Sequence, residues 1–524
     1  MQQFFTITLL SDLCTSDGAP SDGFDVDCAF DSRGIPVIRG TRLKGLLREA
    51  GEELCTLGLA ADADVARLFG TRMGGSVPGV PAALTVFDAH PADLADRRTA
   101  AAGKTPAQCR AEGTVVRVNA SLDEAGVTDR IRTMRAVRRG TVFVCRCTLD
   151  DPALVPLFED CLKLVRHIGI GRTRGMGEVR CVPLDVPPEP AAPPPVLPAD
   201  TVRLRITIEL RSPLLLSEDS EQIPGHTVAG MLARCGLDTD ALREQGARFT
   251  DAAVALGDCP AWTPPACLAA PKRAVPDKDG RMPLYVLDTP ACLALPEPAV
   301  ALRGGHLAVD AAFSDPRFVR VRRTRLPRRE RGPHGRTQVV THEALAEGQR
   351  FIGYLYGPRP VLETAAQLPR TFLTAGGRYR TGGLGECRIR LDAEGPQPPP
   401  PRPKTDLLAV WLLSPAVLFD ENGMYAARPA VLREYLDLLL APDGLRVTAL
   451  DARWVRGCTV AGWRQSWGTP AWAHAAYAAG SVFLVRTSAP VDPRTLEGRA
   501  VGERTAEGFG TFRILPAETL GIVL

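Results

Sequence analysis

The sequence lacks several features that would have placed it in a known class. It has no apolar run of the roughly 18 residues that a membrane-spanning helix needs. The first residues, MQQFFTITLLSDL, lack the basic start and long apolar centre of a signal peptide, so the expected location is the cytoplasm. Neither a Walker sequence nor a GxSxG sequence is present, which gives no support for a P-loop enzyme or a serine hydrolase.

Metal-binding spacings are also missing. The 14 cysteines are scattered without any CxxC pair, and the closest two, Cys145 and Cys147, would share one face of a strand. The seven histidines show no ligand spacing either. The sequence therefore predicts reduced, buried thiols, and we expect no structural metal site.

Lysine is scarce, and this scarcity is informative. Only six of the 63 Lys and Arg residues are lysine, which leaves 57 arginines, although the net charge is only +3. Part of this bias can reflect genomic composition. Arginine is nevertheless the residue suited to bidentate phosphate contacts and to stacking on bases.

Two proline-rich segments divide the chain. Residues 186–200 and 394–405 are stiff and polar enough to read as linkers. They separate three predicted domains at 1–185, 201–393 and 406–524, each of ordinary domain size.

The three domains repeat one pattern. Each opens with a strand (QFFTITLL, VRLRITIEL, LLAVWLLSP) and closes with a glycine-rich turn before a strand (IGIGRTRGMGEV, GRYRTGGLGE, VGERTAEGFG). Amphipathic segments such as TRLKGLLREAGEEL and DPALVPLFEDCLKL lie between them, so the order is that of a split βαβ unit. We expect an α+β protein of tandem ferredoxin-like domains with inserted β-hairpins, the third domain being divergent or partial.

Several of these segments resemble one protein family. IPVIRGTRLKGLLREA, ARLFG followed by LTVFDA, and IGIGRTRGMGEV resemble, in order, the signatures of the RAMP (repeat-associated mysterious protein) superfamily. IPGHTVAG, THEALAEGQRFIG and GRYRTGGLGE repeat the pattern, and GERTAEGFGTFRI adds a third glycine loop. The layout is most similar to the large double-RAMP subunit of subtype III-D CRISPR effectors.

The resemblance implies a fold, partners and a role. The fold would be ferredoxin-like and of the RNA-recognition type. The partners would be CRISPR RNA, target RNA, other RAMP backbone subunits and a large signalling subunit, with no membrane involved. The chain would hold the guide RNA near its 5′ tag in antiviral defence. It departs from the family at Arg39-Gly40-Thr41-Arg42, where small residues are usual, and at Val228-Ala229, where leucine-lysine is expected.

The glycine loops are the first candidate RNA contacts. Glycine lets backbone amides approach a phosphate closely, and arginines stand among the glycines in each loop. The alternative is a plain turn whose arginines face solvent. The predicted contacts are Gly169, Gly171, Arg172, Arg174, Gly175, Gly177, Arg378, Arg380 and Arg504.

Basic segments elsewhere are the second set of candidates. The first helix, the segment DRIRTMRAVRRG and the segment from Pro316 to Arg336, with nine arginines, would neutralise phosphates and make binding sensitive to salt. Both arginine segments sit where RAMP proteins carry a projecting hairpin. The alternatives are a solvated helix face for the first helix, and, for the arginine segments, solubilising loops or loops that contact an acidic neighbouring subunit. The predicted contacts are Arg39, Arg42, Lys44, Arg48, Arg132, Arg135, Arg138, Arg139, Arg322, Arg323, Arg325, Arg328 and Arg329.

An acidic loop supplies the catalytic hypothesis. SDGFDVDCAFDSRG carries Asp25 and Asp27, and the resemblance implies that an aspartate in this loop cuts target RNA in some backbone subunits, with Mg²⁺. The alternative is an ordinary solvated turn. A stand-alone RNA-processing nuclease would need a histidine base such as His226, which also fits a helix cap. We expect no other cofactor, and a non-catalytic RNA-binding subunit is the leading hypothesis.

Overall fold

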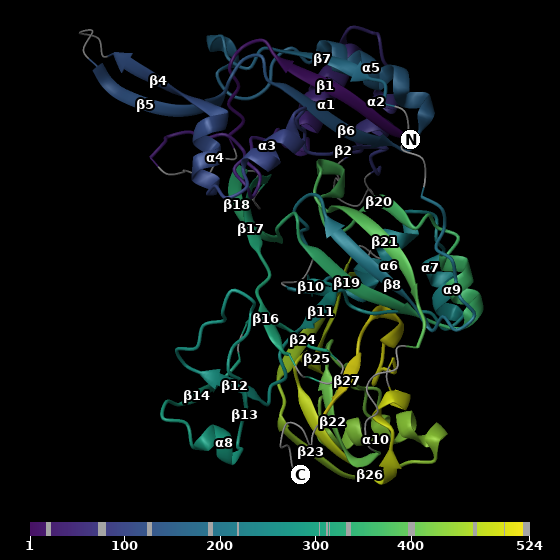
Figure 1. Cartoon of the computed structure of the whole chain (residues 1–524). Coiled ribbons are helices and arrows are strands. Elements are labelled where there is room, and N and C mark those ends of the chain that lie inside the picture. Colours follow the sequence, from purple (N-terminus) through teal and green to yellow (C-terminus); the bar gives the residue numbers. More distant parts are fainter. Residues whose placement is uncertain are drawn as a thin grey trace.

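The computed structural model describes residues 1–16, 23–71, 80–122, 128–186, 192–216, 220–302, 304–310, 313, 315–331, 337–396, 404–464, 469–496 and 498–516. Both proline-rich segments lie partly outside this set. Figure 1 shows three α+β units stacked along the molecule, with the N-terminal unit at one end and the C-terminal unit at the other. We call them the first, second and third domains.

The first domain is built on an antiparallel sheet in the order β2-β6-β1-β7. In β1, the residues Phe5, Ile7 and Leu9 are buried while their neighbours are not, as the period of two requires. Helices α1 and α5 supply the other half of the core. The bounds are β1 (Gln2–Leu9), β2 (Leu84–Val86), β6 (Val142–Leu149), β7 (Val179–Leu184), α1 (Gly40–Thr56), α2 (Asp62–Phe69), α3 (Leu94–Ala100), α4 (Pro106–Gly113) and α5 (Val155–Leu164).

The second domain repeats this sheet with additions. The order β10-β19-β8-β21 corresponds to that of the first domain, while β11, β15 and β16 extend one edge and β20 the other. The bounds are β8 (Arg203–Leu210), α6 (Gly225–Ala233), α7 (Thr239–Glu244), β9 (Arg248–Phe249), β10 (Ala253–Leu256), β11 (Cys259–Trp262), β15 (His306–Ala308), β16 (Arg317–Val319), β19 (Arg350–Tyr356), α9 (Arg359–Ala365), β20 (Thr371–Ala375) and β21 (Glu386–Glu394).

The third domain has the same four strands in the same order. Its sheet runs β23-β26-β22-β27, and α10 packs on one face. A single 3₁₀ turn, η5 (Pro493–Leu496), stands where the other domains have their second helix. The bounds are β22 (Thr405–Leu412), α10 (Pro429–Leu440), β23 (Val447–Trp454), β26 (Val482–Val491) and β27 (Phe512–Leu515). The predicted class, α+β with tandem ferredoxin-like RAMP domains, is confirmed.

Each domain also carries an inserted β-hairpin. The three are β4–β5 (Thr114–Leu122 and Thr128–Val137), β17–β18 (Arg323–Arg331 and Thr337–Leu345) and β24–β25 (Gly457–Arg464 and Thr469–Tyr477). The last residue of each hairpin bridges the segment after the first strand of its domain: Leu13↔Val137, Leu214↔Leu345 and Ala416↔Tyr477. Figure 1 shows β4–β5 projecting well away from the first domain.

A second insertion, in the second domain, covers the third. It holds a small sheet, β13-β12-β14, and helix α8. Its apolar residues share one core with the sheet face opposite α10, where the Trp411 indole N–H donates to Thr263 O at 3.1 Å. The bounds are β12 (Leu268–Pro271), β13 (Tyr285–Val286), α8 (Pro290–Leu293) and β14 (Ala299–Ala301). Among the described helices, none combines the length and apolar character needed to cross a membrane.

Candidate nucleic-acid interface

The three glycine loops share one backbone frame. We call 169–177, 377–385 and 502–510 loop 1, loop 2 and loop 3, and each begins and ends with a glycine eight positions apart. Every one of those six glycines has a positive φ. A 3₁₀ turn lies in the centre of each loop, flanked on both sides by residues in the left-handed conformation: η2 (Arg172–Arg174), η3 (Arg380–Gly382) and η6 (Thr505–Glu507).

The closing glycine of each loop is required by a close approach to its own chain. A Cβ added to Gly177 would lie 1.9 Å from Ile168 O, and one added to Gly385 would lie 1.9 Å from Gly376 O. At Gly510 the distance to Val501 O would be 1.8 Å. Since real atoms never come so close, these glycines are explained by the turn itself, without a phosphate.

Loops 2 and 3 lie between domains. A Cβ on Gly383 of loop 2 would lie 2.9 Å from Val86 O of the first domain, and one on Gly508 of loop 3 would lie 3.0 Å from Phe249 O of the second. Loop 2 therefore packs the second domain against the first, and loop 3 packs the third domain against the second. The sequence could not reveal this, because it does not say what faces a glycine in space.

The arginines of these two loops are partly used by the protein. Arg380 donates to Gly377 O at 3.1 Å, and burial, followed by the nearby Arg234, lowers its pKa. Arg504 pairs with Glu507 at 2.7 Å and lies over the Phe509 ring. Arg378 is exposed, so it is the guanidinium that loop 2 presents to solvent.

Loop 1 is different because it faces no other domain. Arg172 and Arg174 are both exposed, and the nearest carboxylate to Arg172, that of Glu49, is 3.8 Å away. Nothing lies within 4 Å of a Cβ added to Gly175. Loop 1 is thus the glycine loop whose 3₁₀ turn is open to a ligand.

The basic residues of α1 hold the first domain together. Lys44 is buried, and its ammonium donates to Leu84 O at 2.7 Å; burial lowers its pKa to about 8. Arg48 donates to Phe69 O at 2.6 Å and Arg42 to Ser16 O at 3.1 Å. Arg39 forms an ion pair with Asp88 at 2.8 Å. These positions argue against the predicted RNA contacts here, most strongly for Lys44.

The first hairpin presents exposed guanidinium groups. Arg132, Arg138 and Arg139 are exposed, and the side chains of Arg132 and Arg138 form no ion pair with the described part of the chain. Arg135 is different, since it pairs with Asp27 at 3.1 Å and lies 4.3 Å from the centre of the Phe24 ring. The hairpin therefore offers three of its four predicted arginines to solvent.

Asp12, which the sequence did not single out, anchors the base of this hairpin. It accepts the Arg139 backbone N–H at 2.9 Å and forms an ion pair with Arg117. Burial would raise its pKa, but these hydrogen bonds and the two arginines lower it overall. The sequence feature that could have indicated this role is the position of Asp12, three residues after the end of β1.

The second hairpin carries its arginines among carboxylates. Arg322 and Arg325 are exposed, and Arg325 lies 3.5 Å from Glu343. Arg323 lies between Glu221, at 3.6 Å, and Glu343, at 3.7 Å. Arg328 and Arg329 pair in the backbone ladder, and their side chains lie outside the described set.

The two candidate catalytic aspartates bind the base of the first hairpin. Asp25 accepts the Thr133 backbone N–H at 2.7 Å, and this bond lowers its pKa. Asp27 is buried against Arg135 and accepts the Cys28 N–H at 2.8 Å. No group of three or more His, Cys, Asp or Glu side chains that could hold a metal occurs within the described ranges.

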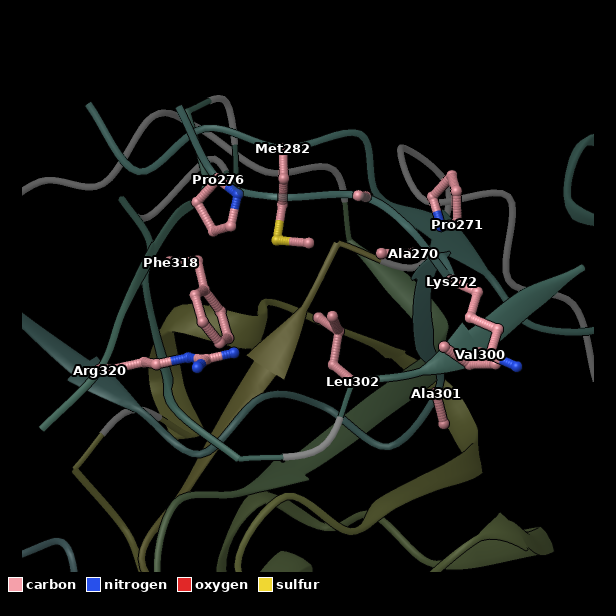
Figure 2. A pocket seen from close by; sticks show the side chains of 11 residues that line it. Ala270, Pro271, Lys272, Pro276, Met282, Val300, Ala301, Leu302, Phe318 and Arg320 are labelled. Carbon is pink, nitrogen blue, oxygen red and sulfur yellow. The ribbon is translucent and has the colours of Figure 1, made fainter. Parts of the chain in front are cut away.

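One pocket lies in the insertion of the second domain. Its volume is about 590 Å³, and Figure 2 shows Met282, Leu302 and Phe318 facing it, with Lys272 and Arg320 at its margin. The Arg320 guanidinium lies 5.9 Å from the centre of the Phe318 ring. The lining residues include no carboxylate, histidine or cysteine, and their charged groups are those of Lys272 and Arg320.

Two family models match separate parts of the chain. The model of the RAMP superfamily matches residues 6–180, and that of the CRISPR-associated protein (Cas_Cmr3) family matches residues 318–517. The repeated sheets, glycine loops and these matches define a RAMP-fold protein. This chain is a CRISPR-associated protein of the RAMP superfamily. The resemblance to subtype III-D stays a prediction.

Comparisons beyond the family models add little. A search of curated proteins finds no match. Similar solved structures include the type III-B Cmr-beta complex in its apo state (10% identity, 35% of this chain and 98% of that chain, TM-score 0.28) and bound to cognate target RNA (11%, 35%, 97%, 0.28). A type IV-B CRISPR complex gives 16% identity over 37% of this chain and 96% of that chain, with a TM-score of 0.27. Scores this low carry no argument about function.

Proposed function

We propose that this chain is an RNA-binding structural subunit of a CRISPR effector complex. It would hold the guide RNA near its 5′ tag and dock other RAMP subunits and a large signalling subunit around guide and target RNA. The observation that supports this is the set of exposed guanidinium groups on the first hairpin, Arg132, Arg138 and Arg139. Exposed guanidinium groups that form no ion pair within the described ranges, as at Arg132 and Arg138, suit contacts to phosphates, which position an RNA without reading its sequence.

One face of the third domain's sheet is covered by protein, which limits the surfaces that RNA can contact. Ferredoxin-like RNA-binding domains stack bases on the open face of their sheet. In the third domain that face is covered by the insertion, which shares a core with Trp411 and Leu484. We therefore assign the RNA contacts to the hairpins and not to this sheet.

Replacing Arg132, Arg138 and Arg139 by alanine is expected to weaken RNA binding by at least about tenfold, because three phosphate contacts are lost. The dependence of log K on log salt should fall in slope by about two, at about 0.7 per contact. Fluorescence anisotropy with a labelled CRISPR repeat RNA, over a salt series, measures both quantities.

The control removes the same charge from another place. Arg428, Arg446 and Arg453 are exposed in the third domain, and their triple alanine variant changes the net charge equally. We expect its affinity to stay within about twofold of the parent. Equal losses in both variants would mean that binding follows net charge alone and would remove the hairpin from the proposal.

Asp25→Ala is expected to leave target-RNA cleavage by the assembled complex unchanged. The Asp25 carboxylate is bound to Thr133 at the hairpin base, and no metal-binding group accompanies it within the described ranges. Incubation of the assembled complex with labelled target RNA and Mg²⁺ measures this. Loss of cleavage with RNA binding intact would instead assign the endoribonuclease role to this chain.

A further inference from the structure

The first helix of the first domain begins at a small site formed by Gly40, the Asp88 carboxylate and the Val86 carbonyl. We call this site, and its counterpart in another domain, the helix-start seat. The Gly40 N–H donates to Asp88 Oδ1 at 2.8 Å, and a Cβ on Gly40 would lie 2.3 Å from Val86 O. Loop 2 covers this seat, since a Cβ on Gly382 would lie 2.3 Å from Thr41 Cγ2. Gly383 lies against the Val86 carbonyl, as described above.

The second domain repeats this seat in detail. The Gly225 N–H donates to Asp251 Oδ1 at 2.8 Å, and a Cβ on Gly225 would lie 2.3 Å from Phe249 O. Loop 3 covers it: the Glu507 carbonyl would lie 2.5 Å from that same Cβ, and a Cβ on Gly508 would lie 2.7 Å from Asp251 Oδ1. The same part of each loop thus occupies the same part of each seat.

Loop 1 has the frame of the other two loops but no seat of its own. Arg174, at the end of its η2 turn, and the left-handed Gly175 match Gly382-Gly383 of loop 2 and Glu507-Gly508 of loop 3, the positions that dock. Residues 172–175 are all exposed. Within the described residues, no helix start lies against loop 1 as those of α1 and α6 lie against loops 2 and 3.

We propose that loop 1 docks on the helix-start seat of a separate RAMP-fold subunit. This contact would repeat, between two subunits, the contact that loops 2 and 3 make with the helix-start seats of the first and second domains. The proposal rests on the proposed function only for the identity of the neighbours. It adds the surface through which one of them is bound.

A second copy of this chain does not fit as the partner. Its first two seats are already filled by its own loops 2 and 3. Its third domain has no such seat, because α10 begins at Pro429, which has no N–H to donate where the other two domains have the N–H of Gly40 and Gly225. The partner is thus a different RAMP-fold chain with an unfilled seat.

The positive charge of loop 1 indicates which side chains the partner should carry beside its helix-start seat. Arg174 stands where loop 2 has Gly382 and loop 3 has Glu507, and Arg172 stands where loop 2 has Arg380. Two guanidinium groups would face the first turn of the partner's helix. We therefore expect carboxylate side chains beside the seat of that subunit, in addition to its capping aspartate.

Site-specific photo-crosslinking tests this contact. The full chain with p-benzoylphenylalanine at Thr173, the centre of η2, is co-expressed with the other subunits of its own CRISPR system, and the complex is purified and irradiated. Mass spectrometry should find the adduct on another RAMP-fold subunit, in the peptide at the start of its first helix. The same amino acid at Leu438, exposed on α10, is the control and should not reach that peptide.

Three outcomes would overturn the proposal: an adduct with RNA, an adduct with a second copy of this chain, or no adduct in an assembled complex. A second variant gives an independent readout. Thr173→Trp adds bulk while keeping Arg172 and Arg174, so it should reduce the copurified neighbour by at least about tenfold and change RNA affinity of the isolated chain by less than about twofold. Normal assembly of Thr173→Trp would also contradict the docking, whereas the hairpin variants decide RNA binding separately.

Discussion

Gly177→Ala should destabilise the first domain by at least about 3 kcal/mol, whereas Gly175→Ala should cost only about 1–2 kcal/mol. The two glycines lie in the same loop with φ values of 74° and 75°, so an alanine at either position carries the strain of a positive φ. They differ in space, because the added Cβ would lie 1.9 Å from Ile168 O at Gly177 and would meet nothing within 4 Å at Gly175.

Hydrogen exchange of the amides in β1 and α5, recorded for the full chain in rising denaturant, measures this difference. The chain has several domains, so a single melting temperature would not isolate the first one. Similar losses in the two variants would mean that backbone strain alone, and not the close approach to Ile168, explains the closing glycine.

Arg146→Met is expected to loosen the joint between the first and second domains. Arg146 of β6 pairs with Glu386 of β21 at 2.5 Å, each side chain is 13% exposed, and the guanidinium lies 3.8 Å from the centre of the Phe87 ring. Removing one partner leaves a largely buried carboxylate without its ion pair, which costs about 3–5 kcal/mol in a fully buried pair and less in this one. Hydrogen exchange at loop 2 and protease cleavage between residues 186 and 200 should both become faster.

The matched control removes both charges. Arg146→Met combined with Glu386→Gln leaves no buried charge unpaired, so most of the lost protection at loop 2 should return. A double variant as loose as the single one would show that the packing of Arg146 on Phe87, and not its charge, holds the joint.

The fold was predictable because the sequence repeats the same pattern of strand and glycine loop three times. Three strands followed by three glycine loops indicated tandem ferredoxin-like domains, and the strand orders of the three sheets confirm it. The complete sheet of the third domain was harder to foresee, because its second helix is reduced to the short η5 turn and leaves little helical periodicity in the sequence. Insertions in the second domain likewise hide its extra strands.

The candidate site was less predictable, because accessibility depends on contacts between distant segments. On a helical wheel Lys44 lies beside Arg48 on a polar face, yet its ammonium reaches a carbonyl of β2 and is buried there. Arg135 sits among exposed arginines in the sequence but pairs with Asp27 across the hairpin base. Which arginines stay available for RNA follows from these partners, and arginine density does not reveal them.

The shared core beneath the insertion has a consequence for how the chain can be divided. Trp262 and Phe313 of the second domain and Trp411 and Leu484 of the third belong to one apolar cluster, although the proline-rich segment 394–405 lies between them in the sequence. Cutting the polypeptide at that segment would leave large aromatic surfaces bare on both fragments. We therefore expect residues 201–516 to unfold together in one cooperative transition, and a fragment that ends at this segment to be less stable than the intact chain.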